Sequence, residues 1–162
     1  MKKIISLILC SVLVIGCLVG CNEVEVIKGV KEEIDNHVQG TLNRLTEEGY
    51  DASADILEKI YKDSTIWYRD IKVEDNIATV IVEVKSKNFS TIINRGSDLA
   101  TSRANSSTHF ETLMNIAMWE VYDKEEPEKR EVELKLSKIG DEWKLDPYSY
   151  NELLYLVTGI RS

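Results

Sequence analysis

The chain has 162 residues, of which 28 are acidic and 20 basic, giving a formal net charge of −8 at pH 7. This length fits one domain and is sufficient to bury a sizeable core. The acidic balance provides no electrostatic means of holding nucleic acid or of lying flat on an anionic lipid surface. Nucleic acid is therefore excluded as an expected partner.

The first 21 residues differ in composition from the rest. Lys2 and Lys3 precede an apolar run over residues 4–19, and Gly20 then comes directly before Cys21. A basic start, an apolar middle and a small residue at the end are typical of an export signal. This order of residues resembles the bacterial lipoprotein signal, in which the cysteine receives a diacylglycerol and becomes the first residue of the mature protein.

That resemblance implies a signal peptide over 1–20 and a single extracytoplasmic domain over 21–162. A diacylglycerol on Cys21 would hold this domain on the outer face of a bacterial cell membrane, because two acyl chains anchor durably where one does not. Anchoring to a single cytoplasmic membrane favours a Gram-positive host. All 28 acidic residues follow the signal, so the mature chain carries a charge of about −10 from 18 basic and 28 acidic residues.

All three cysteines lie in this first segment, so the mature domain is expected to form no internal disulfide. Cys17 also follows a suitable triplet, but Cys21 is preferred because polar sequence begins immediately after it. Cleavage before Cys17 would leave Leu18 and Val19 facing water. The apolar run is shorter than the roughly 20 residues that a transmembrane helix needs. A plain secretory signal, which would release a soluble protein, stays open.

The periodicity of apolar residues predicts the elements in chain order. Steps of three or four predict a helix over 24–47, weakened by about 1 kcal/mol at each of Gly29 and Gly40, and a shorter helix over 51–62. A period of two then predicts strands over 65–74 and 77–87, joined as a hairpin by an Asp-Asn turn.

In the second half of the chain, a helical period is again followed by a period of two, which is typical of strands. A long helix is expected over 90–122, although its Ser-, Thr- and Asn-rich part has low helical propensity. Strands over 131–137 and 142–146 form a second hairpin. Ser149 and Glu152 form a capping-box pattern that opens a final short helix. The predicted fold class is α+β, with the N-terminal helices and one long helix packed on a curved antiparallel sheet of about four strands.

These elements carry a second resemblance. The stretch 138–146 reads Lys-Ile-Gly-Asp-Glu-Trp-Lys-Leu-Asp, and 77–80 reads Ile-Ala-Thr-Val after a turn. With the paired N-terminal helices and the Leu-rich tail, they resemble small bacterial lipoproteins of uncharacterised function that have a cystatin-like, nuclear-transport-factor-like domain. The resemblance covers most of 24–159 and implies a helix in the concave side of the sheet. It implies no activity, because this fold hosts isomerases, dehydratases and binding modules alike.

Chemistry-bearing motifs are few. The chain has two histidines, His37 and His109, and neither lies in a zinc-site spacing. The sequence has no nucleophile elbow, phosphate loop or calcium loop, so no cofactor and no metal are expected. If the protein were an enzyme, His109 with Glu111 or Asp98 would be the first candidate acid–base pair.

The leading hypothesis is a non-enzymatic, membrane-tethered module that binds a protein, a peptidoglycan-related partner or a small apolar ligand. The alternative is a small cavity enzyme of the isomerase or dehydratase type with an acid–base His or Asp, and a third possibility is a spacer without a ligand. Four aromatic residues would either line an apolar pocket or fill the core: Trp67, Tyr68, Trp119 and Trp143.

Overall fold

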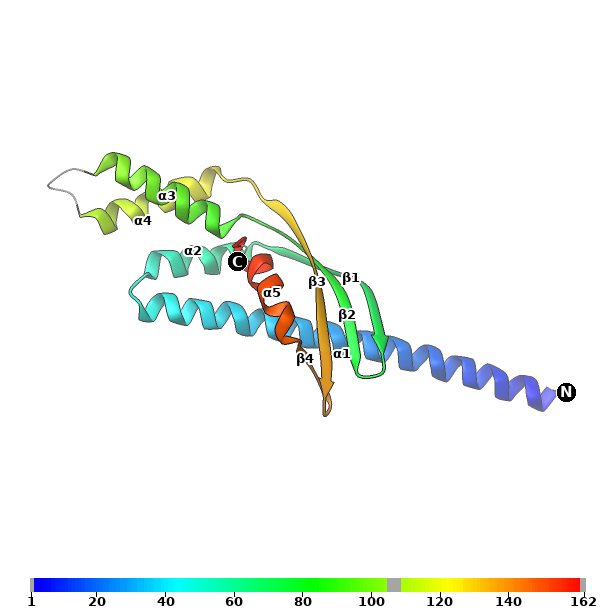
Figure 1. Cartoon of the computed structure of the whole chain (residues 1–162). Coiled ribbons are helices and arrows are strands. Elements are labelled where there is room, and N and C mark those ends of the chain that lie inside the picture. The colour runs from blue at the N-terminus through cyan, green and yellow to red at the C-terminus, as the bar shows by residue number, and fades with distance from the viewer. Residues whose placement is uncertain (1, 105–108, 161–162) are drawn as a thin grey trace.

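A computed structural model describes the backbone of residues 2–104 and 109–160 and the side chains of residues 22–104 and 109–160. The elements confirm the predicted α+β class and are arranged as Figure 1 shows. In chain order they are α1 (Lys2–Glu47), α2 (Asp51–Lys62), β1 (Thr65–Glu74), β2 (Ile77–Ser86), α3 (Phe89–Arg103), α4 (Phe110–Lys124), β3 (Glu128–Ile139), β4 (Glu142–Leu145), a 3-10 turn (Pro147–Ser149) and α5 (Tyr150–Thr158).

The four strands form one antiparallel sheet in the order β1-β2-β3-β4. Both predicted hairpins are confirmed: Val82 on β2 lies opposite Tyr68 on β1, and Leu145 on β4 lies opposite Leu136 on β3. A bulge interrupts β1 between Arg69 and Lys72, where Asp70 has a φ of 51°. Because a bulge bends and twists its strand, it contributes to the curvature of the sheet that is visible in Figure 1.

One face of the sheet is covered by α1 and α5, and the core lies beneath them. The inward side chains of β2 and β3 join one buried cluster with four aliphatic residues of α1 that are at most 1% exposed: Val26, Val30, Ile34 and Val38. Helix α1 lies close against the sheet at Gly29, where a Cβ would lie 2.8 Å from the Trp143 carbonyl oxygen. The opposite face of the sheet is polar, with Arg69 paired to Glu83 and Glu131.

The long helix expected over 90–122 is two helices. Helix α3 ends at Arg103 and α4 begins at Phe110, because the Ser-, Thr- and Asn-rich residues between them favour turns over helix. The two helices pair side by side and project from the sheet beside α2 (Figure 1). They are joined by a bidentate contact of Arg103 with Glu120, at 2.8 and 2.9 Å, and by an ion pair of Arg95 with Glu125.

The capping box expected at the start of the last helix does not form. Ser149 precedes α5, but its side chain makes no cap hydrogen bond; its hydroxyl oxygen accepts from the Lys135 backbone N–H at 3.0 Å. Strand β4 ends at Leu145 and does not reach Lys135 of β3. The Ser149 hydroxyl supplies the hydrogen-bond acceptor for that backbone N–H instead. Gly159 ends α5 in the left-handed region, at a φ of 76°, as a C-cap glycine does.

A buried arginine joins β2, β3 and α5. Arg130 is 3% exposed, and its Nε donates to the Leu156 carbonyl oxygen at 3.2 Å. Its Nη2 donates to the Ser86 hydroxyl at 2.6 Å, and its Nη1 donates to a Glu128 carboxylate oxygen at 2.9 Å. The guanidinium therefore has a partner on each side, as a buried charge requires.

Candidate functional site

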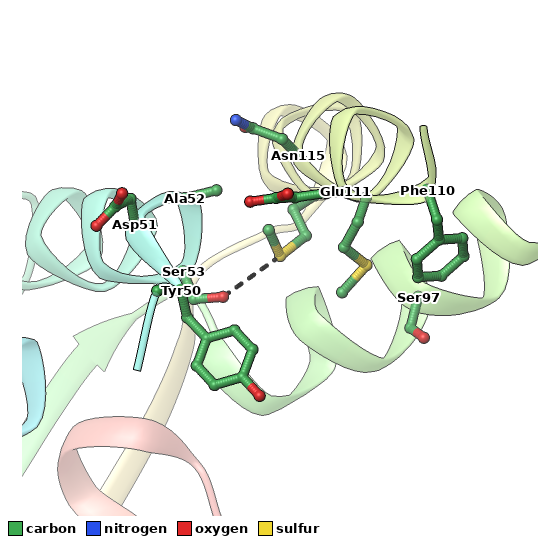
Figure 2. A pocket seen from close by; sticks show the side chains of 11 residues that line it. Tyr50, Asp51, Ala52, Ser53, Ser97, Phe110, Glu111 and Asn115 are labelled. Atoms are coloured by element: carbon green, nitrogen blue, oxygen red, sulfur yellow. Dashed lines mark hydrogen bonds between the residues drawn. The ribbon is translucent and has the colours of Figure 1, made fainter. Parts of the chain in front are cut away.

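A cavity of about 550 Å³ opens between the start of α2 and the α3–α4 pair. Figure 2 shows Tyr50 and Ser53 contributed from the α2 side, Ser97 from α3, and Phe110, Glu111 and Asn115 from α4. The Ser53 hydroxyl donates to the Met118 sulfur at 3.8 Å, which joins α2 to α4 at the cavity wall (Figure 2). We call this space the α2–α4 cavity.

The lining of the α2–α4 cavity is apolar with a few polar groups. Two methionines, Met114 and Met118, provide flexible and polarisable surface, and two aromatic residues, Tyr50 and Phe110, are 57% and 48% exposed. The carboxylates of Asp51 and Glu111 also line it. Such a surface suits a ligand with an apolar body, and the two carboxylates favour a cationic or hydrogen-donating group on that ligand.

The α3–α4 pair is held to the rest of the protein at its base by Tyr122. The Tyr122 hydroxyl donates to the Asp63 carboxylate at 2.9 Å, and Lys87 donates to the Tyr122 carbonyl oxygen at 2.5 Å. Burial and the hydrogen bond to Asp63 raise the pKa of Tyr122 to about 12, so the phenol stays protonated near neutral pH. Lys59 and then Tyr122 lower the pKa of the Asp63 carboxyl, which stays ionised as their acceptor.

The structure does not bring the predicted acid–base pair together. His109 is exposed as the residue before α4, and within the described residues no hydrogen bond or ion pair joins it to Asp98 or Glu111. It is also not part of the cavity lining, to which Glu111 belongs. The structure therefore places His109 apart from both carboxylates that the sequence offered as its partners.

His37 lies on α1 beside a separate surface hollow lined by Arg44 and Leu154. Its Nε2 is buried and has no hydrogen-bond partner among the described residues. Burial, and then the positive charge of Arg44, lower the pKa of His37, so the imidazole is held neutral. Within residues 22–104 and 109–160, no group of three His, Cys, Asp or Glu side chains is placed to hold a metal ion.

The four aromatic residues do not share a pocket. Trp143 is buried in the core, whereas Trp67 is 41% exposed on the uncovered face of the sheet. Trp119 packs edge-on against Tyr122 at 5.4 Å, and Tyr68 is half-buried on β1. The interpretation that they line one ligand site is wrong, and of the cavity residues only Glu111 was a candidate from the sequence. The available signal was in α4, which carries more apolar residues than one buried face can hold. Phe110 and Ile116 are the two that stay exposed.

The side chain of Cys21 lies outside the described residues, as do those of Cys10 and Cys17. The backbone there is described, and it belongs to α1, which continues without a break through the predicted cleavage position into the core. Over the residues whose side chains are described, no helix reaches the length and apolar character that crossing a bilayer requires.

No protein-family model and no curated protein matches the chain. Among solved structures, the crystal structure of the putative lipoprotein ycdA of Bacillus subtilis is similar, with 23% sequence identity and a TM-score of 0.49. The match covers 79% of the present chain and 47% of the other, so it spans about half the length of that structure. A likeness of this degree assigns no function.

Proposed function

We propose that the protein is a lipid-anchored extracytoplasmic binding module that presents the α2–α4 cavity to an apolar ligand or to a side chain of a partner protein. The observation that carries this proposal is the course of α1. It runs from the lipoprotein-like signal through Cys21 directly into the core, and Val26 is its first fully buried residue.

In this proposal, residues 1–20 are removed and residues 21–162 form one domain on the outer face of a Gram-positive cell membrane. The domain then belongs to the cystatin-like, nuclear-transport-factor-like group, with α1 as the helix that packs on one face of the curved sheet. Cys21, at the start of the mature chain, would carry the diacylglycerol.

The length of α1 sets the position of the cavity relative to the membrane. From Cys21 to Glu47 the helix rises about 40 Å at 1.5 Å per residue. Tyr50, which lines the cavity, follows directly after this helix. Cys21 and the start of α2 therefore lie far apart along α1 (Figure 1), and the cavity would stay open to partners when the protein is attached to the membrane.

Replacing Cys21 by alanine is expected to abolish lipid attachment. Cells given a clickable fatty acid should label the wild-type protein, whereas Cys21→Ala should remain unlabelled and keep its leader, seen as a larger mass. Cys17→Ala is the matched control and should label as the wild type does. Equal labelling of wild type and Cys21→Ala would remove Cys21 from the proposal, and loss of labelling in Cys17→Ala alone would move the anchor there.

Truncating Phe110 is expected to weaken the binding of an apolar probe. We expect Phe110→Ala to raise the Kd for 1-N-phenylnaphthylamine about tenfold, because losing one buried aromatic contact costs about 1.4 kcal/mol. Fluorescence titration measures the change. Tyr148→Ala is the control, since Tyr148 is 94% exposed and lies outside the cavity. Equal affinities of the two variants would show that the probe binds elsewhere.

A further inference from the structure

Exposed aliphatic side chains lie at the ends of both hairpins and on the first turn of the mature α1. Ile77 begins β2 and is 45% exposed, Ile139 ends β3 and is 66% exposed, and Val24 on α1 is 67% exposed. The two isoleucines point to the uncovered face of the sheet, next to the turns that close the two hairpins. We call these three residues the hairpin-end surface. Core packing does not explain them, since none of the three is buried.

An ion pair and a backbone hydrogen bond place the two hairpin ends beside the start of the mature helix. The Lys138 ammonium lies 3.5 Å from the carboxylate of Glu25, which is four residues beyond Cys21 and so about 6 Å along the helix. The Lys138 backbone N–H donates to the Asn76 carbonyl oxygen at 2.8 Å, which ties the first turn to the second. Both hairpin ends are thus fixed next to the first turns of the mature α1 (Figure 1).

We propose that the hairpin-end surface rests in the interfacial layer of the bilayer, so that the protein stands on its membrane in one orientation. This inference rests on the proposed lipid anchor at Cys21. An anchor only one turn from Val24 and Glu25 holds these side chains within reach of the membrane, and contact removes exposed aliphatic surface from water. The effective concentration of bilayer at this surface is high because the link to the anchor is short.

The charged groups around the hairpin-end surface determine how it can contact lipid. Lys138 is paired with Glu25, and Lys144 is paired with Glu142 at 2.8 Å, so these cations are neutralised within the protein. The exposed carboxylates of Asp75 and Asp141 occupy the two turns. Anionic headgroups would repel these carboxylates, so the contact is shallow and is made by the apolar side chains.

The test uses the lipidated protein, purified from cells and reconstituted into phosphatidylcholine vesicles. Single cysteines are introduced as Ile77→Cys, Ile139→Cys and Ile116→Cys and labelled with an NBD fluorophore; the acylated Cys21 thiol does not react. Ile116 is the matched control, because it is also an exposed isoleucine, at 51%, but lies on α4 and away from both hairpin ends. We expect vesicles with doxyl-labelled phosphatidylcholine to quench the labels at 77 and 139 at least twofold and to leave the label at 116 unquenched.

The outcomes separate this inference from the anchor. Vesicle flotation reports whether the protein is attached, and thermal unfolding reports whether each variant is folded. Attached, folded protein with all three labels unquenched, or all three quenched equally, would overturn the fixed orientation and leave the anchor intact. Protein that fails to float with vesicles would overturn the anchor and this inference together.

Discussion

Replacing Arg130 by alanine is expected to destabilise the protein by about 3 kcal/mol or more. The change removes three hydrogen bonds and leaves the buried Leu156 carbonyl oxygen and Ser86 hydroxyl without their donor. Each buried polar group that loses its partner costs roughly 1–3 kcal/mol, and the packing of the aliphatic stem is lost as well. Glu128 adds little to this cost because its side chain is 47% exposed and returns to water.

Urea unfolding followed by circular dichroism measures the effect as a fall in midpoint at unchanged slope. Arg69→Ala is the matched control on the same sheet. Arg69 also contacts two carboxylates, those of Glu83 and Glu131, but its side chain is 48% exposed, so we expect a loss of at most about 1 kcal/mol. Arg130→Met should fall between the two, because it keeps the packing and loses the hydrogen bonds. Equal losses for Arg130→Ala and Arg69→Ala would contradict the structural role of the buried guanidinium.

Arg130 also shows that the alternating pattern of β3 extends further toward the N-terminus than the predicted strand. The alternation of Val132, Leu134 and Leu136 predicts an inward face, and extending it by one step places Arg130 on that same face. The expected strand began at Glu131, because the charged residues over 123–129 favour a solvated connector. The observed strand begins at Glu128, since β3 pairs along the full length of β2. Local composition therefore predicted the hairpin and missed how far it extends.

The remaining differences from expectation arise from contacts between distant segments. The class, the sheet and the hairpins follow from local periodicity, which the chain displays clearly. The α2–α4 cavity does not, because Tyr50 and Phe110 are far apart in sequence and meet only when α3 and α4 fold back beside α2. Ser149 illustrates the same limit: its capping-box pattern is local, but its hydroxyl is taken by the backbone N–H of Lys135 on another strand.

Two glycines that look alike in the sequence are expected to respond to alanine with opposite signs. Both lie within α1, where replacing glycine by alanine gains roughly 1 kcal/mol from helix propensity alone. A Cβ at Gly40 would meet nothing within 4 Å, so Gly40→Ala should stabilise the protein by about 0.5–1 kcal/mol. A Cβ at Gly29 would lie 2.8 Å from both the Cβ and the backbone oxygen of Trp143.

The contact at Gly29 cannot be relieved by a side-chain rotation, because Trp143 is 3% exposed and its atoms in the contact belong to the strand backbone or are fixed to it. Helix α1 would have to move off β4, and overpacking of this kind costs about 1–3 kcal/mol or more. We expect Gly29→Ala to lose about 1–2 kcal/mol net and Gly29→Val about 3 kcal/mol, measured by the same urea unfolding. If Gly29→Ala stabilised the protein as Gly40→Ala does, the close approach of α1 to the sheet would be wrong. The position of α1 on the sheet would then need revision, and so would the position of the cavity relative to the anchor.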